Sequence, residues 1–118
     1  MADTEGILWS AVRERIAGQR VVVVTNRKDK ALKRELEDAL GVKIKWVVAE
    51  GPRKVGSLVK SIKSGNVDVV LACTGWIKHK VDGTIAPEAR KAGALYVRVD
   101  KGRPLAVLMA LARELGVE

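Results

Sequence analysis

The sequence predicts an α/β protein in which helices cover both faces of one open, parallel, four-stranded sheet. Stretches typical of strands alternate along the chain with amphipathic helical patterns, and this alternation produces parallel sheets. Two of the apolar runs, residues 21–24 and 67–72, are nearly continuous, as expected of strands that are buried on both faces. The length of 118 residues is sufficient for one such domain with a single core.

The first half of the chain predicts two helices, one before and one after the first strand. Residues 5–17 place Leu8, Val12 and Ile16 four apart, as in an amphipathic helix. After the strand, leucines again recur every fourth residue, and Gly41 marks the end of the second helix. The chain therefore begins with a helix and then enters a strand-helix unit.

The remaining strands establish an order for the sheet. Residues 43–48 and 95–99 alternate polar and apolar side chains, which is typical of edge strands. Helical patterns follow them over residues 55–62 and 104–115. Because the two continuous apolar runs belong inside the sheet, right-handed crossovers give strand order 2-1-3-4, the arrangement of a Rossmann-like or flavodoxin-like three-layer sandwich.

A further helix is expected over residues 82–92. Pro87 is placed near the start of its regular part, because proline in a helix interior breaks the hydrogen-bond ladder. No repeat or linker interrupts the chain. We therefore interpret residues 1–118 as a single α/β domain, with an N-terminal amphipathic helix within residues 1–18 and a Rossmann-like body over residues 19–118.

The charge balance favours polyanionic partners. The chain has 22 Lys and Arg residues against 14 Asp and Glu, a formal net charge of +8 and a pI near 9.9. Cys73 is the only cysteine, which rules out an internal disulfide framework and fits a reducing compartment. We find neither a signal sequence nor a run of about twenty apolar residues. A cytoplasmic protein that does not bind membranes is expected.

Basic residues cluster in the segments that follow the predicted strands. In an open parallel sheet these segments meet at one rim, and ligands bind there at the point where strand order reverses. Helix N-termini at the same rim add backbone donors and positive dipoles. The sequence therefore predicts a site for a phosphate-rich anion. Its predicted ligand-binding residues are Thr25, Asn26, Arg27, Arg53, Lys54, Thr74, Gly75, Trp76, Lys78, His79 and Arg103.

These residues are expected to play different roles. The cations that would contact phosphates are Arg27, Arg53, Lys54, Lys78 and Arg103. Hydrogen bonds would come from Thr25, Asn26 and Thr74. Other lysines, among them Lys30, Lys33 and Lys60, lie on predicted helix exteriors and are interpreted as solvated surface charges.

The tryptophans allow more than one interpretation. Trp76, between Gly75 and a basic run, either stacks against a base or closes the core beneath its loop. Trp46 is expected to pack along its edge strand, whereas Trp9 either covers the sheet or faces a second subunit. For Cys73 we favour a buried, inert thiol over a nucleophile, because free cysteine is among the most buried residue types.

Two segments, residues 69–80 and 89–97, resemble an uncharacterised bacterial family called domain of unknown function 2325. The likeness covers most of residues 20–115, although its motifs are short. It implies a short Rossmann-like sheet with a histidine-containing segment after the third strand, which gives weight to His79. Such proteins often have Ser before this histidine, where the present chain has Lys78. The resemblance implies no activity.

Three classes of function follow from these observations. The first is a non-catalytic module that binds nucleic acid or a nucleotide, without a cofactor or a metal. The second is an enzyme acting on a small phosphorylated substrate, with His79 as a weak candidate for the acid or base. The third is a homodimer that associates through the Trp9 helix or through the edge over residues 44–48. We prefer the first, because the carboxylates are too scattered to form a metal-dependent catalytic site.

Overall fold

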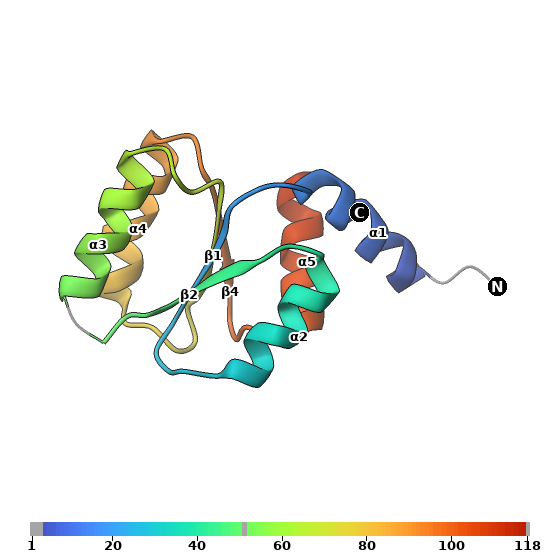
Figure 1. The fold of residues 1–118 in the computed structure, drawn as a ribbon, viewed down its shortest axis with the longest axis horizontal. Helices are drawn as coiled ribbons and strands as arrows, with labels where there is room; N and C mark the ends of the chain where they lie inside the picture. Colours follow the sequence, from blue (N-terminus) through green and yellow to red (C-terminus); the bar gives the residue numbers. More distant parts are fainter. Residues whose placement is uncertain (1–3, 51, 118) are drawn as a thin grey trace.

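The computed structural model describes residues 4–50 and 52–117, which form one sheet between two layers of helices (Figure 1). In chain order the elements are α1 (Thr4–Ile16), β1 (Val21–Thr25), α2 (Lys30–Leu40), β2 (Ile44–Val48), α3 (Pro52–Lys63), β3 (Val69–Cys73), α4 (His79–Lys91), β4 (Leu95–Val99) and α5 (Pro104–Leu115). Neighbouring strands are parallel, and their order β2-β1-β3-β4 confirms the predicted fold.

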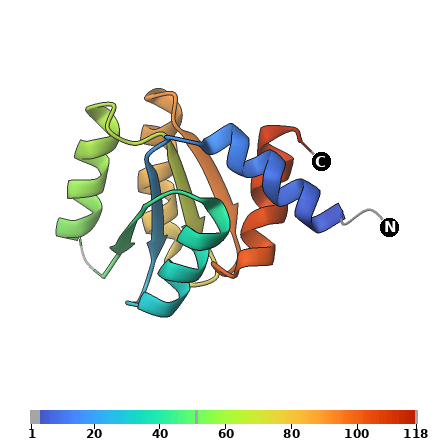
Figure 2. The ribbon, with the colours of Figure 1, turned by 45° about the vertical axis from the view of Figure 1, so that its right-hand side comes forward.

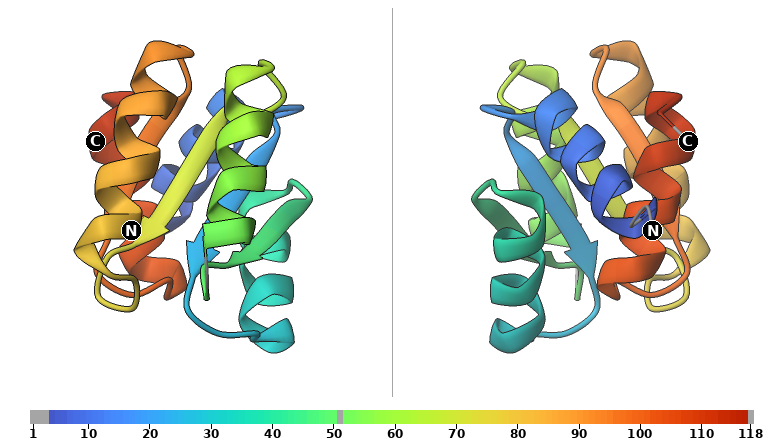
Figure 3. Two further views of the ribbon diagram at one scale, coloured as in Figure 1. Left: turned by 90° about the vertical axis from the view of Figure 1, so that its left-hand side faces the viewer. Right: turned by 90° about the vertical axis from the view of Figure 1, so that its right-hand side faces the viewer.

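Each face of the sheet is covered by its own group of helices. α3 and α4 lie side by side on one face, and α1, α2 and α5 cover the other (Figures 2 and 3). Side chains of β1 alternate between the two cores: Val21 and Val23 pack on the α2 side, and Val22 and Val24 on the α3 side. A continuous apolar run is therefore what a strand with two buried faces requires.

The N-terminal helix α1 forms part of the core. Val12 and Ile16 are fully buried, and the half-buried ring of Trp9 packs against the same cluster. The helix contacts both α5 and α2. Trp9 thus covers the core of its own chain.

Helix α4 begins earlier than the sequence predicts. It spans His79–Lys91, and Pro87 lies inside it, so the prediction that Pro87 stands near the start is wrong. Proline lacks the N–H that would bond to the carbonyl of Gly83, four residues earlier. Both residues are exposed, so water can solvate the freed carbonyl and the helix continues. His79 consequently opens a helix, whereas the sequence placed it in a loop.

Other boundaries are close to the predicted ones. β3 starts at Val69, since Asp68 accepts hydrogen bonds from the backbone N–H of Arg20 at 2.7 Å and from its guanidinium at 3.0 Å. α5 has the predicted bounds: Pro104 suits its first turn, and Gly116 ends it with a φ of 69°. None of the helices in residues 4–50 and 52–117 is both long and apolar enough to cross a membrane.

A polar cluster joins α4 to the edge strand β4. The hydroxyl of Tyr96 donates to the carboxylate of Asp82 at 2.6 Å, and Nε of Arg98 donates to the same carboxylate at 3.0 Å. Partial burial raises the pKa of Asp82, but the hydrogen bonds from Arg98 and Tyr96 outweigh it, so the net pKa lies below its ordinary value. The ionised carboxylate therefore stabilises the folded chain.

Replacing Asp82 by Asn should reduce the acid sensitivity of the fold. Because the folded-state pKa is lowered, the stabilisation by Asp82 is complete above about pH 4, where the unfolded carboxyl titrates, and is lost as the pH falls through the folded value. The free energy of unfolding, measured by urea denaturation, should differ between wild type and Asp82→Asn at pH 7 and converge in acid. A difference that stays constant with pH would contradict this role.

Candidate functional site

Four helices begin at the rim where the strands end. The arrowheads of the strands and the first turns of α2, α3, α4 and α5 lie at the same end of the sheet in Figure 3. Asp29 caps α2 by accepting from the N–H of Leu32 at 2.9 Å. Lys78 and Arg103 occupy the corresponding positions of α4 and α5 and provide no side-chain cap. The first turns of these two helices therefore keep backbone donors available at the rim.

A groove of about 700 Å³ lies at this rim between α3 and α4, and we call it the crevice groove. It is lined by Asn26, Ala49, Glu50, Val55, Gly56, Val59, Trp76, Ile77, Lys78, Lys80, Val81 and Thr84. These residues come from the segments after β1, β2 and β3 and from both helices, so the groove lies where the strand order reverses. Its walls are largely apolar, and Asn26, Lys78 and Lys80 supply polar and cationic groups.

Trp76 belongs both to this groove and to the core. Its half-buried ring packs against the cluster that contains Leu32 and Cys73. A side-chain carbon on Gly102 would lie only 3.8 Å from Cζ3 of the ring, so the β4–α5 loop passes directly beneath it. The guanidinium carbon of Arg27 lies 4.7 Å from the ring centroid, within cation–π range. Core packing and ligand contact are thus compatible roles for this residue.

The segment after β3 is hydrogen-bonded to the end of β4 and the residue that follows it. The N–H of Thr74 donates to the carbonyl of Val99 at 2.8 Å, and the N–H of Gly75 donates to that of Asp100 at 2.6 Å. The hydroxyl of Thr74 also donates to Val99 at 3.2 Å, so its proton is not available to a ligand. A side chain at Gly75 would collide with the backbone and carboxylate of Asp100. Glycine here allows the close approach that holds the Trp76 loop in place.

Two of the residues at the strand ends are fully buried. Thr25 has no exposed surface, and its Oγ1 has no hydrogen-bond partner among the described residues. It therefore does not line the groove, where the sequence expected it to donate to a ligand. The alternation Val21, Val23 along β1 already points Thr25 into the core. Burial raises the pKa of the Cys73 thiol to about 12, which agrees with the predicted inert cysteine.

A second hollow, of about 370 Å³, lies beside the outer edge of β2, and we call it the edge groove. It is lined by Lys28, Asp29, Lys30, Lys33, Lys45, Trp46, Val47, Val48, Lys54, Ser57 and Leu58. Five lysines thus surround one carboxylate, which is engaged in capping α2. The sequence predicted solvated helix exteriors for Lys30 and Lys33, and it did not predict this surface. The sequence feature that could have indicated this surface is Lys45, a charged residue within an otherwise apolar edge strand.

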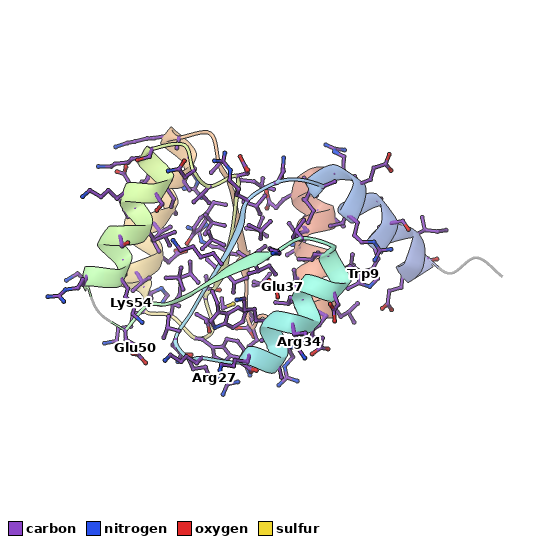
Figure 4. The ribbon with its side chains drawn as sticks, viewed as in Figure 1. Trp9, Arg27, Arg34, Glu37, Glu50 and Lys54 are labelled. Atoms are coloured by element: carbon purple, nitrogen blue, oxygen red, sulfur yellow. The ribbon has the colours of Figure 1, made fainter. Side chains whose placement is uncertain are left out.

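The predicted cations do not form one cluster. Lys78 lines the crevice groove and Lys54 lines the edge groove, on opposite sides of α3. Figure 4 shows Arg27, Glu50 and Lys54 along the same rim. Arg53 belongs to the first turn of α3 and lines a separate hollow with Lys60 and Lys63.

Two other predicted site residues, Arg103 and His79, also lie at the rim. Arg103 precedes α5 and is exposed. His79 is exposed at the start of α4, and its imidazole has no hydrogen-bond partner in the part of the chain that the structure describes. Gly51, which the sequence placed in the second basic segment, lies outside the described residues.

The rim cations lack carboxylate partners. The ion pairs found in residues 4–50 and 52–117 involve other cations: Arg20 pairs with Asp68, Lys63 and Lys91 with Glu88, and Arg98 with Asp82. Within the same residues, no group of three or more His, Cys, Asp and Glu side chains is arranged to hold a metal ion. The rim therefore carries unpaired cations that fit anions, alongside the exposed carboxylates of Glu50 and Asp100.

Comparison of the chain with protein-family models, with curated proteins and with solved structures finds no match.

Replacing Trp76 by Ala should lower the free energy of unfolding by about 2 kcal/mol, because the half-buried ring contacts the core and Arg27. Trp76→Phe keeps an aromatic ring and should lose less than half as much. Urea denaturation of the three proteins measures both effects. Unchanged stability of Trp76→Ala would show that the ring does not contribute to core packing.

Proposed function

We propose that the protein is a non-catalytic module that binds a phosphate-rich ligand, nucleic acid or a nucleotide, in the crevice groove. The observation that carries this proposal is the combination, in one groove, of apolar walls, a partly exposed tryptophan and unpaired cations at the first turn of a helix. Phosphates would be bound by Lys78, Lys80 and the free amides of α4, with Arg27 alongside.

The apolar walls favour an unpaired base. Val55, Val59, Ile77 and Val81 line the groove together with Trp76, and a duplex would present phosphates and groove edges to such a surface instead of base faces. Single-stranded nucleic acid exposes both phosphates and rings. It is therefore the form of nucleic acid that we propose.

The spread of cations favours a polymer over one nucleotide. Arg27, Lys78 and Arg103 belong to segments that follow three different strands, β1, β3 and β4. A single nucleotide can contact only part of such a surface, whereas successive phosphates of a strand can follow it. The single reduced cysteine, Cys73, fits the cytoplasmic location that we also propose.

An enzymatic role for His79 has less support. A general base needs a group that orients its imidazole, and no carboxylate or carbonyl of the described residues bonds to the imidazole of His79. The resemblance to the uncharacterised bacterial family implies a histidine in this segment but no reaction.

Binding of labelled oligothymidylate should weaken linearly with the logarithm of salt concentration. Removing one phosphate contact by Lys80→Ala should reduce the slope by about 0.7. Lys91→Ala, at the opposite end of the same helix, is the matched control and should leave the slope unchanged. Lys33 is a surface lysine as well, but it lines the edge groove near the rim and is therefore not used as a control. Fluorescence anisotropy between low and moderate salt measures these slopes.

Absence of binding at low ionic strength would reject the proposal. Adenosine monophosphate binding as tightly as the oligomer would instead identify a small nucleotide as the ligand.

We further propose that two copies of the chain associate through α1 and α5. Ile7, Leu105 and Met109 are large apolar residues on these helices whose exposures are 60%, 56% and 42%. A two-fold interface buries each of them twice. Trp9 packs inward and is not required for this contact.

Sedimentation equilibrium should show a homodimer that Leu105→Glu dissociates, because each interface would then bury two unpaired charges. Glu114→Lys, an exposed charge reversal on the opposite face of the same helix from Leu105, is the control. A wild-type monomer at high concentration would contradict the proposal.

A further inference from the structure

The outer edge of β2 carries backbone groups that have no partner. β2 pairs with β1 in a parallel ladder, in which the N–H of Ala49 donates to the carbonyl of Thr25. In such a ladder every second residue directs its N–H and carbonyl toward the neighbouring strand, so Lys45, Val47 and Ala49 face β1. The backbone groups of Ile44, Trp46 and Val48 must therefore point away from the sheet. This edge is where another strand could add.

Side chains and turns close the two ends of this edge and leave its middle open. The N–H of Ile44 donates to the carboxylate of Glu37 at 2.8 Å, and the carbonyl of Val48 accepts from the N–H of Glu50 at 3.0 Å. No described residue bonds to the N–H or carbonyl of Trp46, the carbonyl of Ile44 or the N–H of Val48. These four groups alternate acceptor and donor, as an incoming strand requires.

Lysines stand on both faces of this open edge. Lys28, Lys30 and Lys33 come from α2 and the segment before it, on the face that carries the Trp46 ring. Lys45 and Lys54 belong to β2 and α3, on the opposite face. None of the five forms an ion pair with a described carboxylate. The side chains of an added strand point alternately to the two faces, so each face would meet lysines.

We propose that the β2 edge binds an extended acidic peptide segment, which adds to the sheet as a fifth strand. Charge complementarity identifies the partner: a second copy of this chain would bring the same lysines against their equivalents, whereas Asp and Glu side chains would pair with them.

Hydrogen bonding separates a peptide from a nucleic-acid strand. The open carbonyls of Ile44 and Trp46 need donors, which a peptide backbone has and a phosphodiester backbone lacks. The surface thus differs in chemistry from the crevice groove, where the first turn of α4 presents free backbone N–H groups. Failure of nucleic-acid binding would leave this inference unaffected.

A labelled peptide of alternating Glu and Thr residues is the probe for this site. Fluorescence anisotropy at low salt should show binding of this peptide and not of one made of Lys and Thr. Methylating alternate backbone nitrogens of the probe removes strand hydrogen bonds without altering its charge and should weaken binding by about tenfold. In the complex, amide hydrogen exchange should slow at Trp46 and Val48.

Charge reversals in the protein provide the second arm of the test. Lys45→Glu and Lys33→Glu should each lower the affinity for the Glu-Thr peptide roughly fivefold. Lys60→Glu, an exposed change on α3 that does not line the edge groove, should have no effect. Since all three side chains are solvent-facing or only half-buried, the variants should fold.

Several results would overturn the proposal. No binding of the Glu-Thr probe at low salt would reject it outright. If the methylated and unmethylated probes bind with equal affinity, the peptide is held by charge alone and does not add to the sheet as a strand. Oligothymidylate that displaces the probe and is weakened by Lys45→Glu to the same extent would show that the edge groove binds phosphates.

Discussion

Burial of β1 and β3 on both faces is the constraint on which the rest of the molecule depends. All five residues of each strand are buried, so both faces of the sheet need a layer of helices. Parallel neighbours can be joined only by crossovers, and each crossover helix must start where the preceding strand ends. The first turns of α2, α3, α4 and α5 therefore gather at one rim. A ligand site at that rim follows from how the core is covered.

The basic character of the rim reflects where the carboxylates are used. Asp68 and Glu88 neutralise cations at the opposite end of the sheet and helices. At the rim, Asp29 is engaged in capping α2, and Glu50 is the carboxylate that lines the crevice groove. Positive helix dipoles and unpaired lysines consequently share one surface. Their mutual repulsion destabilises the free protein, and a bound anion would reduce that repulsion.

The sheet order was predictable because a strand with two buried faces leaves a continuous apolar run in the sequence. The start of α4 was not, because tolerance of Pro87 depends on whether its freed carbonyl meets water. For Trp76 the sequence left two roles open, since Gly102, which lies beneath the ring, is distant along the chain. The edge groove was missed because Lys33 and Lys45 become neighbours only when α2 packs beside β2.

The two edges of the sheet are protected in different ways. Beside β4, the charge of Arg98 is neutralised by Asp82, which also accepts from Tyr96. Beside β2, lysines remain unpaired while the backbone groups of Trp46 stay open. Charged side chains on an edge normally prevent two copies of a sheet from pairing. The same lysines would attract a strand of opposite charge, so a device that blocks self-association also defines the partner that the edge can accept.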